Sequence, residues 1–144
     1  MTMRRRVHIR REDGQALVEF ALVLPLLMAL LLGIVQFGIV FNNYETLTDA
    51  TRVGARKAAV ARFVGDNGAS AIAAVKSSAT GLDLSAPGAV KVTSCPTDAT
   101  CATNDWTTTG NVVTVTATYP YSIKILDWTV KAGNLTSVTK ERLE

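Results

Sequence analysis

The residues best placed to do chemistry in this chain lie near its N-terminus, in the run Gly14-Gln15-Ala16-Leu17-Val18-Glu19-Phe20. The run stands between a basic head and a long apolar stretch, a layout typical of a proteolytic cleavage site set directly against a membrane helix. Glu19 would lie just inside the bilayer, where a carboxylate costs a few kcal/mol near the centre and less at the edge. The pattern therefore predicts cleavage after Gly14 and a specific use for the buried acid.

Cleavage would change the charges that Glu19 can meet. Gln15 would become the new N-terminus, with a free ammonium group, and Glu19 would occupy the fifth position of the mature chain. The ammonium of a neighbouring subunit could then neutralise Glu19 and set the axial register of packed helices, because a nearby opposite charge favours the ionised acid. A simpler interpretation is that Glu19 lies at the headgroup level and extends its carboxylate into water.

The apolar stretch predicts a transmembrane helix. Phe20 to Phe41 are 22 residues without a charge, and such a helix spans about 33 Å, enough for a bilayer core. Ala29 and Gly33 form a small-residue face for the close approach of neighbouring helices. Pro25 removes a backbone donor, which either loosens the helix for extraction from lipid or is simply a tolerated membrane proline.

The charges around this helix predict its orientation. Five arginines precede it, so the positive-inside tendency leaves the N-terminus in the cytoplasm and exports everything beyond Asn42. Residues 1–14 form the leader, 15–41 the transmembrane and assembly helix, and 42–144 an extracytoplasmic domain. The leader has a net charge of +3 (five Arg against two acids), and the other 130 residues have 10 basic and 10 acidic residues. The positive charge thus belongs to the leader, and we expect no nucleic-acid partner. The arginines are Arg4, Arg5, Arg6, Arg10 and Arg11.

The exported region lacks the usual signatures of catalysis. The single histidine, His8, lies in the leader, the acids are scattered, and no Gly-x-Ser-x-Gly or phosphate-loop pattern occurs. We therefore expect no enzyme, no cofactor and no metal site.

The membrane helix is expected to continue outside the bilayer to about Val64, with a small-residue face for packing. That face holds Leu47, Ala50, Gly54, Ala58 and Ala61. Two acids and two bases lie opposite, where they either bridge to neighbouring subunits or form a solvated surface: Glu45, Asp49, Arg52 and Arg56. A second helix is expected from about Ala69 to Thr80, after the glycine-rich turn at 65–68.

The C-terminal part alternates in the manner of strands. Val90–Thr93 is one short strand, and Val112–Tyr119 is the clearest, with apolar residues at its odd positions. The same parity continues beyond Pro120, which predicts an edge position or a bend there. Leu135–Leu143 is the expected last strand. The predicted fold is α+β: a transmembrane helix that continues into an exported helix, packed on a small antiparallel sheet, the general plan of a pilin head.

Cys95 and Cys101 are the only cysteines. An even number in an exported domain favours a disulfide, and so small a loop would contribute about 2 kcal/mol in the chain-entropy model. A metal site would need further ligands, and a redox pair usually has two intervening residues rather than five.

The aromatic residues of the same region are expected to be core, or else an adhesive surface: Trp106, Trp128, Tyr119 and Tyr121.

Together these motifs resemble the N-terminal region of TadE-like proteins, the small pseudopilins of tight-adherence (Flp-type) pilus systems. The resemblance covers about residues 10 to 62, and residues 141–144 weakly resemble the end of the family. It rests on the Gly14-Gln15 block, Pro25, the Gly33–Phe41 segment, and the motif formed by Arg52, Gly54, Ala55 and Arg56.

The resemblance implies cleavage by a dedicated prepilin peptidase of the inner membrane and a role as a minor or accessory component. Two features differ from major pilins: the first mature residue is Gln15, and the exported part is far larger than a short Flp pilin. Both favour an accessory or tip role over a bulk shaft subunit.

The predicted function is that of a processed minor pilin or pseudopilin, which takes part in the assembly, initiation or capping of a pilus for surface adherence. Its expected partners are the bilayer, the peptidase and other pilin subunits, which contact it through the N-terminal helix. Its expected location is the cytoplasmic membrane or the filament. The alternative is an unprocessed single-span protein that displays an extracytoplasmic binding or adhesin domain.

Overall fold

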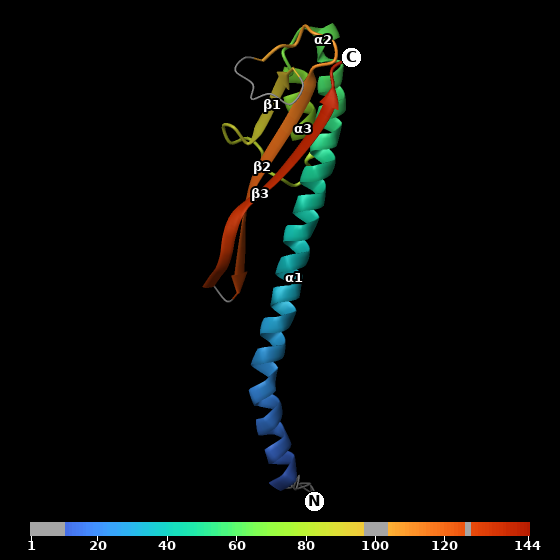
Figure 1. Ribbon diagram of the computed structural model, residues 1–144. Helices are drawn as coiled ribbons and strands as arrows, with labels where there is room; N and C mark the ends of the chain where they lie inside the picture. Colours follow the sequence, from blue (N-terminus) through green and yellow to red (C-terminus); the bar gives the residue numbers. More distant parts are fainter. Residues whose placement is uncertain (1–10, 97–103, 126–127) are drawn as a thin grey trace, which may run out of the picture.

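The computed structural model describes residues 11–96, 104–125 and 128–144. One long helix, α1 (Arg11–Ala59), forms a shaft, and its C-terminal end packs into a small head. The head also contains α2 (Ala61–Val64), α3 (Ala69–Ser78) and a three-stranded sheet (Figure 1). The predicted α+β class, with a helix packed on an antiparallel sheet, is confirmed.

The helix α1 has 49 residues, which corresponds to about 73 Å. It runs without a break across the predicted boundary between residues 41 and 42. It ends at Ala59, so the expectation of one helix to Val64 was wrong by a single turn. The break follows from two hydrogen bonds. The amide of Phe63 donates to the carbonyl of Val60 (3.1 Å), and the amide of Glu144 donates to the carbonyl of Ala59 (2.9 Å).

The turn between α2 and α3 is glycine-rich, as the sequence indicates. Gly65 ends α2 in the left-handed conformation (φ 68°). The Asp66 carboxylate then accepts hydrogen bonds from two backbone amides at the start of α3, those of Gly68 (3.0 Å) and Ser70 (2.7 Å). Hydrogen bonds from Ser70 and Gly68 hold the pKa of Asp66 below its ordinary value.

The sheet is antiparallel in the order β1-β2-β3, with strands Val90–Cys95, Val112–Ile125 and Trp128–Arg142. The odd positions of β2 face α1 and α3: Val113, Val115 and Ala117 are fully buried. The predicted alternation is therefore confirmed. Both long strands exceed the predicted ranges, since β2 continues past Tyr119 and β3 begins at Trp128 rather than Leu135.

The extra length of these strands forms a projecting hairpin, here called the β2–β3 arm (residues 118–125 and 128–136). Strand β1 stops pairing at Ala117, and the amide of Thr118 makes the last bond on that side, to Ala89 (2.8 Å). Backbone groups alternate along a strand, so Pro120 faces the open edge, where its missing N–H costs nothing and discourages a further strand. The predicted edge position of Pro120 is confirmed.

The core of the head lies between the C-terminal half of α1, helix α3 and the sheet. Trp106 is 8% exposed and packs on Gly68, where a Cβ would lie 2.7 Å from the indole ring. Tyr119 is partly buried against the same core. The core interpretation therefore holds for both. Tyr121 is also partly buried, and the side chain of Trp128 lies outside the described residues. Leu143, near the end of the chain, is also buried.

Candidate functional site

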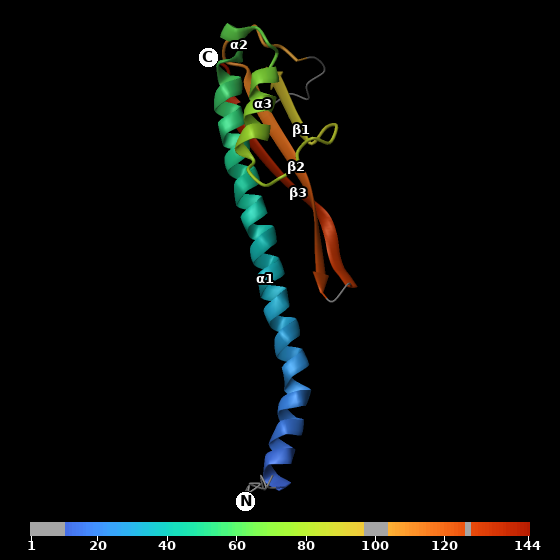
Figure 2. The same ribbon diagram turned by 180° about the vertical axis from the view of Figure 1, so that it is seen from behind.

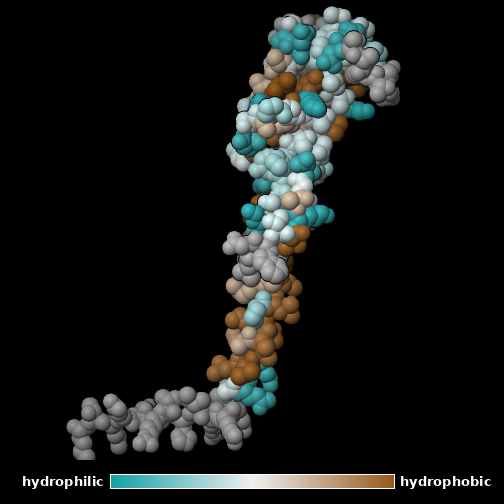
Figure 3. All heavy atoms as spheres, turned by 90° about the vertical axis from the view of Figure 1, so that its left-hand side faces the viewer, coloured by the Kyte–Doolittle hydropathy of each residue, from teal (hydrophilic) through white to brown (hydrophobic). Residues whose placement is uncertain are grey.

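The N-terminal half of α1 is apolar and exposed. Figure 3 shows hydrophobic residues covering this part of the shaft, in contrast to the mostly polar head. The helix is long and apolar enough to cross a membrane, and none of its most apolar window is buried within the chain. An exposed apolar surface of this size needs an apolar environment, so α1 is a candidate membrane span rather than a core helix.

The predicted processing site lies at the start of this helix. Gly14 and Gln15 fall within the first turns of α1, and no atom lies within 4 Å of a Cβ placed on Gly14. Residues 1–10 of the leader lie outside the described residues. The side chain of Gln15 donates a hydrogen bond to Glu19 (Nε2 to Oε1, 3.2 Å), and the Glu19 carboxylate is exposed. It is thus accessible to a charge brought by another chain.

The predicted helix-packing residues are open to a partner. The helix continues through Pro25, and a Cβ placed on Gly33 would meet no atom within 4 Å. Ala29 lies one turn before Gly33, on the same side of the helix. A second helix could therefore approach this face closely.

The Arg-x-Gly-Ala-Arg motif divides between the two sides of α1. Gly54 and Ala55 are buried against the head, whereas Arg52 and Arg56 are exposed. A Cβ on Gly54 would overlap Cγ2 of Val75 in α3, so this glycine sets how closely the two helices pack. Arg52 forms an exposed ion pair with Asp49 (3.1 Å), and such pairs contribute little to stability. Gly54 and Ala55 of the motif thus pack in the head, and Arg52 and Arg56 form an exposed charged surface.

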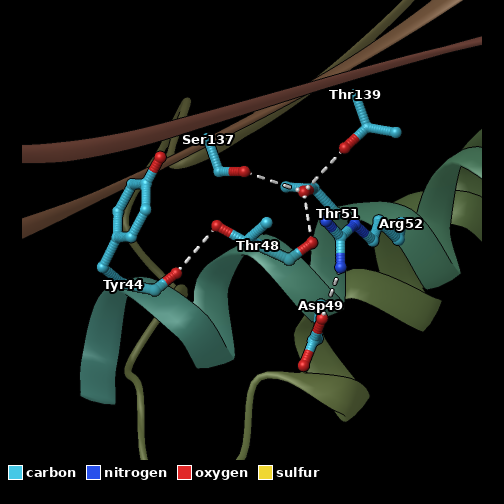
Figure 4. A network of polar contacts seen from close by, with 7 residues as sticks. All are labelled: Tyr44, Thr48, Asp49, Thr51, Arg52, Ser137 and Thr139. Atoms are coloured by element: carbon cyan, nitrogen blue, oxygen red, sulfur yellow. Dashed lines mark hydrogen bonds and ion pairs between the residues drawn. The ribbon is translucent and has the colours of Figure 1, made fainter. Parts of the chain in front are cut away.

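A buried hydroxyl network beside this motif was not expected from the sequence. Thr51 in α1 is fully buried, and it contacts the Ser137 hydroxyl and the Thr139 hydroxyl of β3, both at 3.0 Å (Figure 4). It donates its own proton to the carbonyl of Thr48 (2.8 Å). A hydroxyl has one donor and two acceptor positions, so Ser137 and Thr139 are the donors, and Thr51 is fully satisfied. The one indication of this network in the sequence was Thr51 itself, a polar residue that directly follows Ala50 of the packing face.

We expect Thr51→Val to destabilise the head by about 1–3 kcal/mol, because valine leaves the buried Ser137 hydroxyl and the half-buried Thr139 hydroxyl without their acceptor. The matched control is Thr48→Val. Its hydroxyl bonds back to the carbonyl of Tyr44 (2.8 Å) in a solvent-exposed position, so its loss should change stability little. Denaturant unfolding of the full chain in detergent, followed by near-UV circular dichroism, measures both. Equal effects of the two substitutions would contradict the role given to the network.

The segment just before β2, residues 104–111, is held by Asp105. Its amide donates to the Ser94 carbonyl (2.9 Å), and its carboxylate accepts from the amide (2.9 Å) and the hydroxyl (2.7 Å) of Thr107. Hydrogen bonds from Thr108 and Thr107 hold the pKa of Asp105 well below its usual range. The segment therefore ends in a well-anchored turn against β1.

Cys95 is the last residue of β1 and is buried. Cys101 lies outside the described residues, so the disulfide stays a prediction. Protein from the exported fraction should lose about two hydrogens in intact mass relative to its reduced form. Alkylation of both cysteines without prior reduction would overturn the prediction.

The part of the chain that the structure describes holds no group of three or more His, Cys, Asp or Glu side chains arranged to bind a metal ion. The four charged residues opposite the packing face of α1 are all exposed: Glu45, Asp49, Arg52 and Arg56.

The comparisons with known proteins match this N-terminal region. Residues 14–56 match the family model described as TadE-like protein, a range that begins at the predicted cleavage site and ends at Arg56. No curated protein and no solved structure matches the chain. The resemblance drawn from the sequence is confirmed over this range, where the chain is similar to the TadE-like family.

Proposed function

We propose that this chain is a minor pilin or pseudopilin of a tight-adherence pilus, processed after Gly14 and used to assemble, initiate or cap the filament. The observation that carries the proposal is the position of the TadE-like segment. Residues 14–56 lie on one unbroken helix whose first half is apolar and exposed and whose C-terminal end, from Leu47 on, packs one face into the head. Such a helix can be held in a bilayer before assembly and packed among other helices afterwards.

The exposed surface of α1 supports contact with other subunits. The faces at Ala29 and Gly33 are open, and the Glu19 carboxylate is exposed and faces no cation of its own helix within ion-pair distance among the described residues. In lipid, a lone carboxylate is costly, and an ammonium group at Gln15 of a neighbouring processed subunit would offset that cost. We propose that this pairing sets the axial register.

The proposed orientation follows from the arginine-rich leader, which places the head outside the cytoplasm. We propose a structural role and no catalysis. The alternative, an unprocessed single-span protein that displays a binding head, uses the same fold. In that alternative, Glu19 only extends its carboxylate into water at the headgroup level, and the glycine at the leader boundary has no role.

Complementation of a deletion strain tests the filament role. Loss of this chain should abolish or shorten surface pili, and the wild-type chain should restore them, as seen in sheared-filament yield and adherence to glass. The chain itself should appear in the sheared fraction or remain with the assembly machinery in the membrane. Normal pili and adherence without the chain would contradict the proposal.

A further inference from the structure

We propose that the end of the β2–β3 arm, here called its tip and represented by the described residues 122–124 and 129–131, rests in the headgroup layer of the membrane that α1 crosses, as a second contact between the head and the lipid surface. This inference rests on the membrane anchor and orientation given under the proposed function. Tyr119 and Leu135, at the base of the arm, pack against the core of the head, whereas the described residues beyond them do not belong to it. Figures 1 and 2 both show it leaving the head and running back along α1 toward the N-terminal half.

The level of the arm is fixed by the hydroxyl network. The 3.0 Å contact between Thr51 and Ser137 places these two residues side by side. From Ser137 to Val130, strand β3 runs for seven residues, or about 23 Å. From Thr51 to Phe41, the last apolar residue of the predicted span, α1 covers ten residues, or about 15 Å.

The arm therefore reaches the membrane even when it does not run parallel to α1. A strand inclined by about 45° still descends about 16 Å over those seven residues. The tip then lies at the level of Phe41, and a smaller inclination places it deeper. A head held upright on a spanning α1 must therefore bring the arm into the interfacial layer.

The side chains near the tip suit that layer. Val130 is 63% exposed and lies next to Lys131, which is also exposed. On the other strand Ile123 is partly buried and Lys124 is exposed. Apolar residues with neighbouring lysines are the composition of an interfacial element, because the ammonium groups reach the lipid phosphates while the apolar parts avoid water.

A second protein strand fits the β2 edge of this arm less well than lipid does. The open edge of β2 has Pro120 in its middle, which offers no N–H to an added strand. Among the described residues near the tip, the exposed charged side chains are Lys124 and Lys131, and both are basic, which complements an anionic lipid surface. Lipid is therefore the occupant that we propose.

A fluorescent probe on single cysteines tests the inference with the full chain in vesicles of phosphatidylcholine and phosphatidylglycerol in equal amounts. The probe is an environment-sensitive dye on Val130→Cys, and the quencher is lipid brominated along its acyl chains. Val138→Cys is the matched control: it lies on the same strand, is 54% exposed, and is about 26 Å further from the tip. Val35→Cys, within the apolar half of α1, reports insertion, and the wild-type chain treated with the same dye gives the background.

We expect blue-shifted, quenched emission at positions 35 and 130 and unchanged emission at 138. Lys124→Glu together with Lys131→Glu should reduce the quenching at 130 and leave that at 35 unchanged. Quenching at 35 without quenching at 130 would overturn the arm contact and leave the anchor intact. No quenching at 35 would overturn the anchor and, with it, the arm contact. A blue shift at 130 that increases with the amount of protein per vesicle, without quenching by brominated lipid, would assign the arm to a second protein chain instead.

Discussion

Replacing Glu19 by valine should leave the chain in the membrane but remove it from the assembled filament. The substitution replaces a carboxylate by an apolar side chain in a helix whose surroundings are already apolar, so insertion should be at least as favourable as before. Under the proposed function, what the variant loses is the partner for a neighbouring subunit's ammonium group. The amount recovered with sheared filaments or the assembly complex should fall to background, while the amount in membranes stays the same.

Two further variants separate charge from size at this position. Glu19→Asp keeps the charge and should restore part of the incorporation, whereas Glu19→Gln keeps the size without the charge and should behave as valine does. If Glu19 only extends into water at the membrane surface, all three variants should be incorporated normally. That result would remove the register role while leaving the membrane anchor in place.

A second large effect is expected at Gly54. Alanine at an open helical position usually stabilises a helix by about 1 kcal/mol relative to glycine. At Gly54 the added Cβ overlaps Cγ2 of Val75, with the Ala71 carbonyl oxygen 3.3 Å away and Val115 Cγ1 3.6 Å away. Valine side chains in helices strongly prefer one rotamer, so the helices must move apart. We expect Gly54→Ala to destabilise the head by about 1–3 kcal/mol and Gly54→Leu to prevent its folding.

The controls for Gly54 lie in the same chain. Gly38, also in α1, has no atom within 4 Å of its Cβ position, so Gly38→Ala should not destabilise the head. Val75→Ala should rescue Gly54→Ala in part, because it removes the methyl group that the new Cβ meets. Protease resistance and near-UV circular dichroism of the full chain measure these effects. A Gly54→Ala variant as stable as wild type would contradict the packing described for the motif.

Much of the fold could be predicted because it depends on local periodicity. The apolar face of α1 at Leu47 and Ala50 and the alternation of Val113 and Val115 in β2 are both read from neighbouring residues. The family resemblance likewise lies within a short segment. The location of the two motif arginines on the outside of the helix follows from the same helical spacing.

The parts that could not be predicted depend on contacts between distant segments. The end of α1 at Ala59 is set by the amide of Glu144, and the Thr51 network needs β3, which lies more than 80 residues away (86 for Ser137). The length of the arm follows from the pairing of Tyr121 with Gly133, where the glycine makes room for the ring: a Cβ on it would lie 3.2 Å from Tyr121 Cε1. The alternation of β2 continues past Pro120 in the sequence, but it does not indicate which residue of β3 pairs with Tyr121.

The most direct test of the central claim is the mass of the N-terminal peptide of the protein isolated from its native membranes, with and without the prepilin peptidase. The account predicts a peptide that begins at Gln15 when the peptidase is present and a chain that keeps its leader when the peptidase is absent. A chain that keeps Arg4 to Gly14 in both strains would contradict processing. The unprocessed, single-span display protein would then be the better description.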